Sequence, residues 1–187
     1  MAIQSDTMKY FEYYTKHTYK VVLAWKDIQD ILIENHIINE EEFSKINNLI
    51  IWHDNSKIDQ EEFDAYAAKY YPIVSETTIS STDEINNNFK SAWEHHKKYN
   101  LHHHQTLKTY QGVDWKCYLI DMICDWIAMG WETGTLAYDY YQENKDKIDL
   151  PFEYKIFLEE TLSLIINNQC YANEPFSTEK QAILVFK

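Results

Sequence analysis

The side chains that could do chemistry in this sequence are histidines and aspartates at positions where a helix would bury them. His17 falls in the apolar stripe of one amphipathic segment, and His53, directly followed by Asp54, falls in that of the next. Asp121 and Asp125 lie four residues apart on one face of the most apolar segment. Carboxylates buried there are costly to keep ionised unless a cation or a proton relieves them. Neutral imidazole and ionised carboxylate are ligands of divalent cations, so the pattern predicts a metal site.

A second set of histidines lies in the middle of the chain. His96 extends the apolar stripe of Phe89 and Ala92, whereas its neighbour His95 follows polar positions and is expected to face outward more. Three further histidines follow at 102–104, just after the same helix should end. The sequence leaves open which of these three faces a site.

Each of these residues, taken alone, has a purely structural alternative. A lone histidine on an apolar face is commonly a hydrogen-bonded core residue, and Asp54 stands where a helix ends and a turn begins. Asp121 would cap or face solvent, Asp125 would accept a hydrogen bond from a buried ring, and 102–104 would be a solvated loop. The metal is favoured because separate helices all direct imidazole or carboxylate inward, which a well-packed core avoids.

Helices must position these side chains, because the hydrophobic period is helical along nearly the whole chain. Helices are predicted over 7–35, 60–71, 82–100, 114–129, 135–143 and 151–167, and over a further segment that starts at 40 and ends near 54–56. The segment 114–129 is apolar nearly all round, which predicts a central, buried helix. A loop is expected over 75–82 and irregular structure over 101–112, and only AILVFK near the C-terminus is strand-like.

The predicted fold class is therefore all-α, a single-domain bundle of six or seven helices over residues 1–187. The metal-site core should occupy about 7–129, with C-terminal helices and a tail over 130–187. Asn39 and Asp59 are expected to cap helices at their N-termini. Gly130 and Gly134 are expected to interrupt or end the central helix.

Composition excludes several classes of function. The chain of 187 residues carries a formal charge of −13, and all 17 of its basic residues are lysines. An acidic surface without guanidinium groups repels a phosphate polymer, which disfavours nucleic-acid binding, although a bound metal would still admit a small anion. Three glycines cannot form a Gly-rich phosphate loop or a nucleophile elbow. No stretch approaches the ~18 apolar residues of a membrane span, and three cysteines without a C-x-x-C pair suit a reducing cytoplasm.

With these residues placed, the sequence resembles the HD-domain superfamily of metal-dependent phosphohydrolases. The resemblance rests on an inward His17, on the pair His53 and Asp54 at the end of the following helix, and on Asp125 in a buried helix. It extends from the first helix to about Met129, roughly two thirds of the chain. The segments HDNSKIDQEEFDAY, AWEHHKKYNLHHH and MICDWIAMG also resemble a group of small bacterial and phage proteins placed near that superfamily, a likeness that implies no activity.

The resemblance implies that four residues hold one metal: His17, His53, Asp54 and Asp125. Members with two metals add two histidines from the middle of the chain, with the aspartate of the pair bridging, and His96 with His102 or His103 would serve here. These candidates are only six or seven residues apart, closer than is usual in such members. The expected cofactor is one or two divalent ions, and Mn, Mg, Fe, Zn and Co all remain open.

The resemblance also implies catalytic roles for Asp54, Asp121 and Lys57. Asp121 would orient a water or act as general base, or else only support the metal ligands. Ser56, Lys57 and His103 would contact the substrate phosphate, with solvent exposure as the alternative for Ser56 and Lys57.

The expected function is metal-dependent hydrolysis of a phosphoester in a nucleotide or similar small metabolite. An HD-type di-iron oxygenase is an alternative, because it uses much the same ligands. A second alternative is a non-catalytic, metal-stabilised protein that sequesters a small molecule or contacts another protein. Tyrosines expected at the surface favour this last alternative: Tyr13, Tyr70, Tyr71, Tyr140 and Tyr141. The sequence does not determine the oligomeric state.

Overall fold

The computed structural model describes residues 5–73 and 82–167 and is built of helices. In chain order these are α1 (Thr7–Glu34), α2 (Glu40–Ile51), the 3-10 helix η1 (Asn55–Ile58), α3 (Gln60–Tyr70), α4 (Thr82–Tyr99), α5 (His104–Leu107), α6 (Trp115–Thr133), α7 (Ala137–Asn144) and α8 (Phe152–Asn167). Within the described ranges the only β-type pairing is an isolated bridge between Ser5 and Pro72. The predicted all-α fold is confirmed, while the strand-like AILVFK and nearly all of the predicted loop 75–82 lie outside the described residues.

Two local differences from the predicted helices have physical causes. The four-residue helix α5 lies inside the segment 101–112, which was expected to be irregular, and it raises the number of α-helices to eight in the described chain. Helix α6 runs through Gly130 and ends at Gly134, whose φ of 76° is the left-handed conformation that glycine adopts readily. A Cβ at Gly130 would lie 2.3 Å from the carbonyl oxygen of Thr135, so this glycine permits a close backbone approach and does not end the helix.

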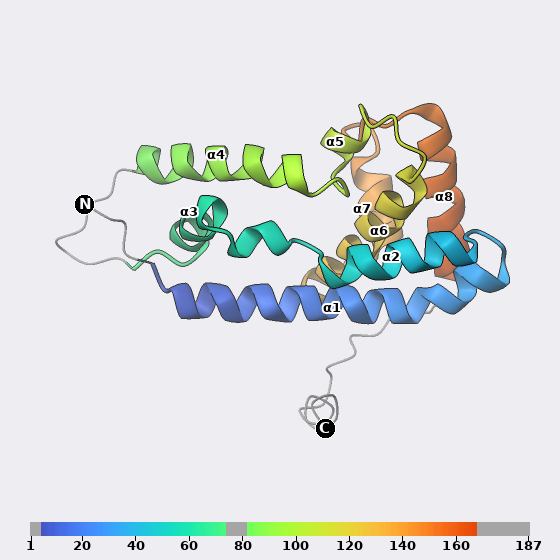
Figure 1. The fold of residues 1–187 in the computed structure, drawn as a ribbon, viewed down its shortest axis with the longest axis horizontal. Coiled ribbons are helices and arrows are strands. Elements are labelled where there is room, and N and C mark those ends of the chain that lie inside the picture. The colour runs from blue at the N-terminus through green and yellow to red at the C-terminus, as the bar shows by residue number, and fades with distance from the viewer. Residues whose placement is uncertain (1–4, 74–81, 168–187) are drawn as a thin grey trace, which may run out of the picture.

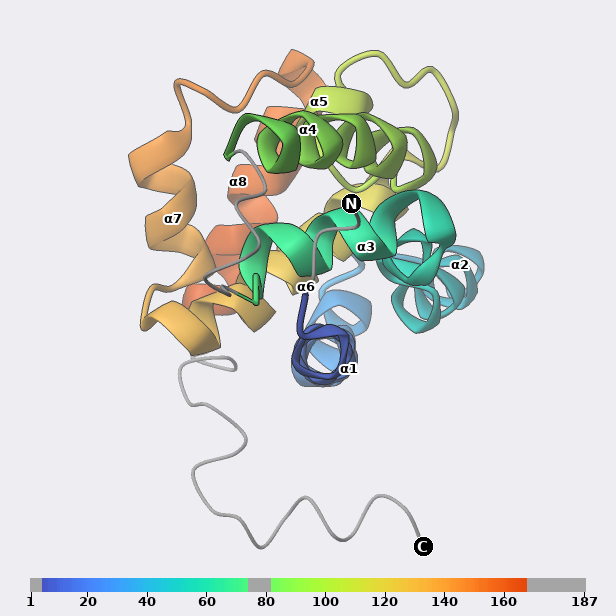
Figure 2. The same ribbon diagram turned by 90° about the vertical axis from the view of Figure 1, so that its left-hand side faces the viewer.

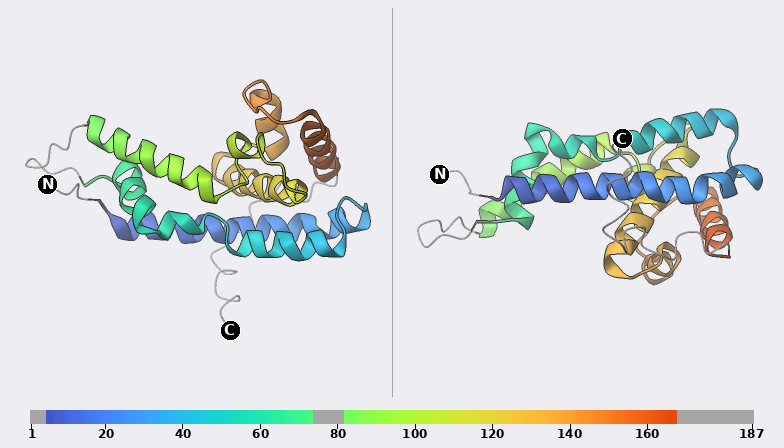
Figure 3. Two further views of the ribbon diagram at one scale, coloured as in Figure 1. Left: turned by 45° about the horizontal axis from the view of Figure 1, so that its top comes forward. Right: turned by 90° about the horizontal axis from the view of Figure 1, so that it is seen from below.

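The helices form an elongated body with α6 near its middle. Helix α1 spans most of its length, with α3 and α4 paired at one end and α7 and α8 at the other (Figures 1 and 3). Helix α6 packs against α1, α2, α7 and α8, which confirms the predicted central helix. No helix of the described chain is long and apolar enough to cross a membrane.

The apolar interior is divided into two clusters. The larger one joins α1, α2, α6 and α8, and the smaller one lies between α1, α3 and α4. Figure 2 shows these last three helices from the end of the molecule. On α1, His17 stands between Tyr10 of the smaller cluster and Val21 of the larger cluster. The polar centre therefore occupies the boundary between the two clusters.

Helix α2 has the predicted N-terminal cap, but it ends earlier than predicted. Asn39 accepts a hydrogen bond from the backbone N–H of Glu42, whose carboxylate accepts one from the backbone N–H of Asn39. The helix ends at Ile51, three to five residues before the predicted end, so His53 lies in a turn and not on a helix face. Asp59 stands at the start of α3, but its side chain forms no capping hydrogen bond there.

Candidate metal centre

Five segments bring the sequence-predicted residues together. His17 comes from the middle of α1, and His53 and Asp54 come from the turn after α2. The remaining residues come from the end of α4, from the turn before α5 and from α6: His96, His102, His103, Asp121 and Asp125. All are buried except His103, which is half-buried, and Asp125, whose side chain is 18% exposed.

Asp54 lies at the centre and has an unusual backbone conformation. Its φ of 57° and ψ of 19° are left-handed, a region that costs most residues energy but that Asp tolerates better than larger or branched side chains do. This turn lets the chain leave α2 and enter η1 with the carboxylate pointing inward. The sequence signal for a turn-forming aspartate and the signal for a metal ligand therefore describe the same residue.

One oxygen of Asp54 faces the first ligand group, which consists of His17, His53, Asp125 and Asp54 Oδ2. His17 Nε2 lies 3.2 Å from Asp125 Oδ1 and 3.5 Å from Asp54 Oδ2. His53 Nε2 lies 3.5 Å from Asp54 Oδ2 and 3.8 Å from Asp125 Oδ1. Ligand atoms held about 2.1 Å from one ion stand about 3.0–3.5 Å apart in octahedral or tetrahedral geometry. The spacing of this group fits a bound cation.

The other oxygen of Asp54 faces the second ligand group, which consists of His96, His102, His103 and Asp54 Oδ1. His96 Nε2 lies 3.1 Å and His102 Nε2 lies 3.5 Å from Asp54 Oδ1. His103 offers a ring nitrogen within 4.8 Å of the other ligand atoms. The short spacing between residues 96 and 102 is accommodated because the chain turns back directly after α4.

Several ligand atoms at this centre have no hydrogen-bond partner in the described chain. They are Nε2 of His53, His96, His102 and His103, together with Asp54 Oδ1. Buried polar atoms are nearly always hydrogen-bonded, and unpaired ones cost about 1–3 kcal/mol each. A cation between these lone pairs would satisfy them together, so both groups fit a divalent metal.

Two buried carboxylates, Asp121 and Glu62, contact the Nδ1 atoms of the ligand histidines. Asp121 Oδ1 lies 2.9 Å from His53 Nδ1, and Asp121 Oδ2 lies 3.3 Å from His102 Nδ1. Glu62 accepts from Nδ1 of His96 at 2.9 Å. A histidine that donates from Nδ1 keeps a lone pair on Nε2, which is the atom aimed at Asp54.

Asp121 and Ser56 both contact the imidazoles of the centre. Both oxygens of Asp121 face ring nitrogens, which fits the supporting role among the three that were predicted. Ser56 is buried, accepts a hydrogen bond from Asn100 at 2.7 Å, and lies 3.3 Å from His96 Nδ1. Ser56 therefore lies beside the second ligand group and does not line the cavities next to the centre.

Sequence reasoning missed Glu62. It lies in the first turn of α3, where an acidic residue is ordinarily explained by the helix dipole, yet its side chain is fully buried. Its other oxygen is 2.7 Å from Nδ1 of His95, the neighbour that was expected to face outward more and is 26% exposed. The available signal was the paired histidines 95 and 96, whose two rings require an acceptor on the facing helix.

Lys57 adds a positive charge beside Asp54. Its ammonium group forms a short ion pair with Asp54 Oδ2 and lies 5.6 Å from the centre of the Tyr66 ring. The side chain is 16% exposed, so it is close to the surface of the centre and is not a freely solvated lysine.

The electrostatics of the centre follow from carboxylates and imidazoles sharing a small volume. Burial alone would lower the pKa of His53, but the Asp54 and Asp121 carboxylates raise it to about 9. Burial raises the pKa of Asp121, yet His53 and His102 lower it to about 2. Burial, followed by the charge of His102, holds the pKa of His103 well below its usual range. His103 is therefore neutral and able to ligate at neutral pH.

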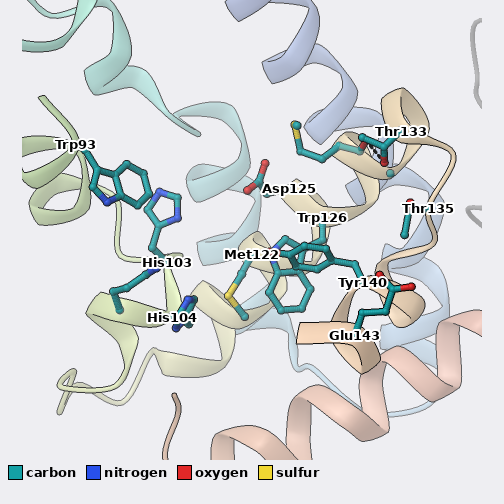
Figure 4. A pocket seen from close by; sticks show the side chains of 13 residues that line it. Trp93, His103, His104, Met122, Asp125, Trp126, Thr133, Thr135, Tyr140 and Glu143 are labelled. Carbon is teal, nitrogen blue, oxygen red and sulfur yellow. Dashed lines mark hydrogen bonds between the residues drawn. The ribbon is translucent and has the colours of Figure 1, made fainter. Parts of the chain in front are cut away.

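A cavity of about 460 Å³ gives access to the centre. Asp125 of the first ligand group and His103 of the second lie on its wall (Figure 4). A smaller cavity of about 260 Å³ reaches His53, His102 and Asp121 from another direction. Of the predicted site residues, Asp125 and His103 are thus the ones that line the larger cavity.

The fold and the centre define an all-helical protein with a buried His/Asp cluster that could hold metal. The chain belongs to a family of unknown function, DUF5662, whose model matches residues 6–172. No curated protein and no solved structure shows significant similarity to it.

Proposed function

We propose that this protein hydrolyses small phosphate esters with two divalent metal ions bridged by Asp54. The observation that carries the proposal is the position of Asp54, whose two oxygens face two separate sets of imidazole nitrogens. A carboxylate shared in this way is typical of sites with two metals about 3.5–4 Å apart, which act on phosphate esters. It also supports the proposed relationship to the HD-domain superfamily, whose pattern supplies the same residues.

The charge balance favours an anionic substrate once metal is bound. Four carboxylates stand against the single ammonium group of Lys57 in the centre: Asp54, Glu62, Asp121 and Asp125. Two divalent cations would reverse that excess of negative charge. Because the chain as a whole is acidic and lacks Arg, a small phosphorylated molecule is favoured over a nucleic-acid polymer.

The protein residues have distinct tasks in this proposal. Bound metal ions would supply Lewis acidity toward the phosphoryl group and lower the pKa of a water. Lys57 would offset negative charge beside the ligand groups, because its ammonium group forms an ion pair with Asp54 at the centre. Asp121 and Glu62 keep the imidazoles oriented, and His103 lies between the ligands and the cavity, where a substrate would enter.

The composition of the second ligand group favours one alternative, a di-iron oxygenase. Apart from Asp54 it offers only imidazoles, and imidazole suits iron as well as zinc. The second alternative, a sequestering protein, loses part of its support because Tyr141 is buried and Tyr13 and Tyr71 are half-buried against the smaller apolar cluster. Cys117 and Cys124 are buried free thiols, which supports placing the proposed enzyme in a reducing cytoplasm.

The proposal is tested by turnover on a panel of phosphomonoesters and phosphodiesters with Mn²⁺ or Mg²⁺, in air and under anaerobic conditions. Equal turnover with and without dioxygen is expected, and Asp54→Gly should abolish it. Glycine accepts the left-handed φ at this position, so the variant removes the carboxylate without adding backbone strain. His36→Gly is the matched control, because His36 has the same φ of 57° and is exposed. Activity that requires iron and dioxygen would contradict the hydrolase and support the oxygenase.

A further inference from the structure

The larger cavity has a second end, away from the ligand groups, with its own chemistry. Figure 4 shows Trp126, Tyr140 and Glu143 gathered at that end, while Trp93 and His103 lie at the other. Tyr140 and Glu143 are one turn apart on α7, so they share a face of that helix. Two aromatic rings and a carboxylate therefore meet where the organic part of a substrate would lie.

The two rings form a corner. The ring centres of Trp126 and Tyr140 are 5.1 Å apart and their planes meet at 62°. Trp126 is supported by Tyr141, whose ring stacks at 6.4 Å and whose hydroxyl donates to Glu159 at 2.7 Å. This support holds the indole in place, so the corner exists before any ligand arrives.

The charge of the cavity wall has one sign. Among the described residues that line it, the charged ones are Asp125 and Glu143, and none is a lysine. Glu143 is exposed where it lines the cavity, so its carboxylate is accessible to a ligand.

We propose that this end of the cavity, the Trp126/Tyr140/Glu143 corner, binds an ammonium group on the organic part of the substrate. The faces of indole and phenol rings attract an ammonium or quaternary ammonium cation, and a nearby carboxylate completes the neutralisation. The two ends of the cavity then recognise opposite charges: the metal-loaded ligand groups hold the phosphate, and the corner holds the cation. For the phosphate end the inference rests on the proposed function, whereas the corner stands on its own geometry.

The same observations disfavour other organic groups. A polyphosphate or a second carboxylate would meet Glu143 without a cation to balance it. A neutral aromatic group would gain contact with the rings and with Met122 and Met129, but it would gain no electrostatic attraction from the Glu143 carboxylate. The substrate class is therefore a phosphomonoester with an ammonium-bearing organic part.

Equilibrium binding tests the corner without any turnover. Choline is titrated against 3,3-dimethylbutanol, which has the same shape but no charge, and binding is followed by calorimetry. Choline should bind at least about tenfold more tightly. Glu143→Gln and Tyr140→Leu should remove that preference, whereas Tyr140→Phe keeps it because the ring face binds the cation. Glu153→Gln, an exposed acid on α8, is the matched control and should change nothing.

Turnover tests the link between the two ends. With Mn²⁺, phosphocholine should be hydrolysed with a kcat/KM about tenfold higher than that of 3,3-dimethylbutyl phosphate. In Glu143→Gln the kcat/KM values of the two substrates should become similar. Equal binding of choline and its neutral isostere would overturn the corner, even if phosphoesters were hydrolysed. Selective choline binding without hydrolysis of any phosphoester would support the corner and contradict the proposed hydrolase.

Discussion

The two ligand groups that meet at Asp54 are assembled in different ways. The first takes residues from α1, from the turn after α2 and from α6, which are far apart in the sequence, and it contains a second carboxylate, Asp125. Apart from Asp54, the second comes from 96–103 alone and contains only imidazoles. The first group therefore depends on helix packing and carries more negative charge, whereas the second depends on one local turn and is nearly neutral.

This difference bears on which metals the two groups would prefer. Carboxylate oxygen suits hard cations such as Mn²⁺ and Mg²⁺, while imidazole suits Zn²⁺, Fe²⁺ and other transition metals. We expect the first group to accept Mn²⁺ readily and the second to select for transition metals. Asp54 couples the two, because each oxygen serves one group.

Removal of Asp54 should have the largest effect, because it breaks both groups at once. Asp54→Gly should reduce bound metal from about two equivalents to nearly none, as measured by elemental analysis of dialysed protein. His36→Gly, with the same backbone conformation at an exposed position, should retain full metal content. Unchanged metal in Asp54→Gly would show that the ions lie elsewhere.

Removal of one histidine at a time should distinguish the metal bound by the first ligand group from that bound by the second. His17→Ala should remove the ion of the first group and His96→Ala that of the second, so each variant should keep about one equivalent by elemental analysis. With Mn²⁺ and Zn²⁺ supplied together, the ion left in His96→Ala should be enriched in Mn²⁺ relative to that left in His17→Ala. Identical metal identity in both variants would contradict the proposed difference in preference.

The supporting carboxylates should produce smaller, graded effects. Loss of such a partner behind a ligating imidazole costs about 10–100-fold in metal affinity. Asp121→Asn should weaken both ions, because Asp121 contacts a histidine of each group, whereas Glu62→Gln should weaken only the second. Competition with a chelator of known affinity measures the metal affinity of each variant. A Glu62→Gln variant that weakens both ions equally would show that the groups are coupled beyond Asp54.

The smallest expected effect is a pH dependence that differs between the metal-free and metal-loaded protein. The pKa of His53, about 9, lies above its ordinary value of 6.5. Its protonation therefore stabilises the metal-free fold fully below pH 6.5, and this contribution is lost as the pH rises to about 9. Metal binding requires the neutral ring, so affinity should rise over the same interval. Melting temperatures at about pH 6.5 and 8.5 should show a larger gain from Mn²⁺ at the higher pH, and a constant gain would contradict this.

The sequence predicted the helices and the inward side chains because both follow from local pattern. The apolar period placed His17 and His96 on buried faces, and both are buried. The apolar period did not predict two local features: Gly130 is explained by the close carbonyl oxygen of Thr135, and α5 forms inside a segment without a clear period.

What the sequence determined by itself is part of the set of side chains that need a charge-compensating partner, since the helical period predicts the burial of His17, His96 and Asp121. The tertiary structure decided how that set is divided. Which oxygen of Asp54 faces which imidazole depends on a left-handed turn and on helices more than 60 residues apart in the chain, as in the 68-residue separation of His53 and Asp121. Glu62 likewise becomes a partner of the centre only when α3 packs on α4, because a residue's role as a hydrogen-bond acceptor depends on the element that comes to face it.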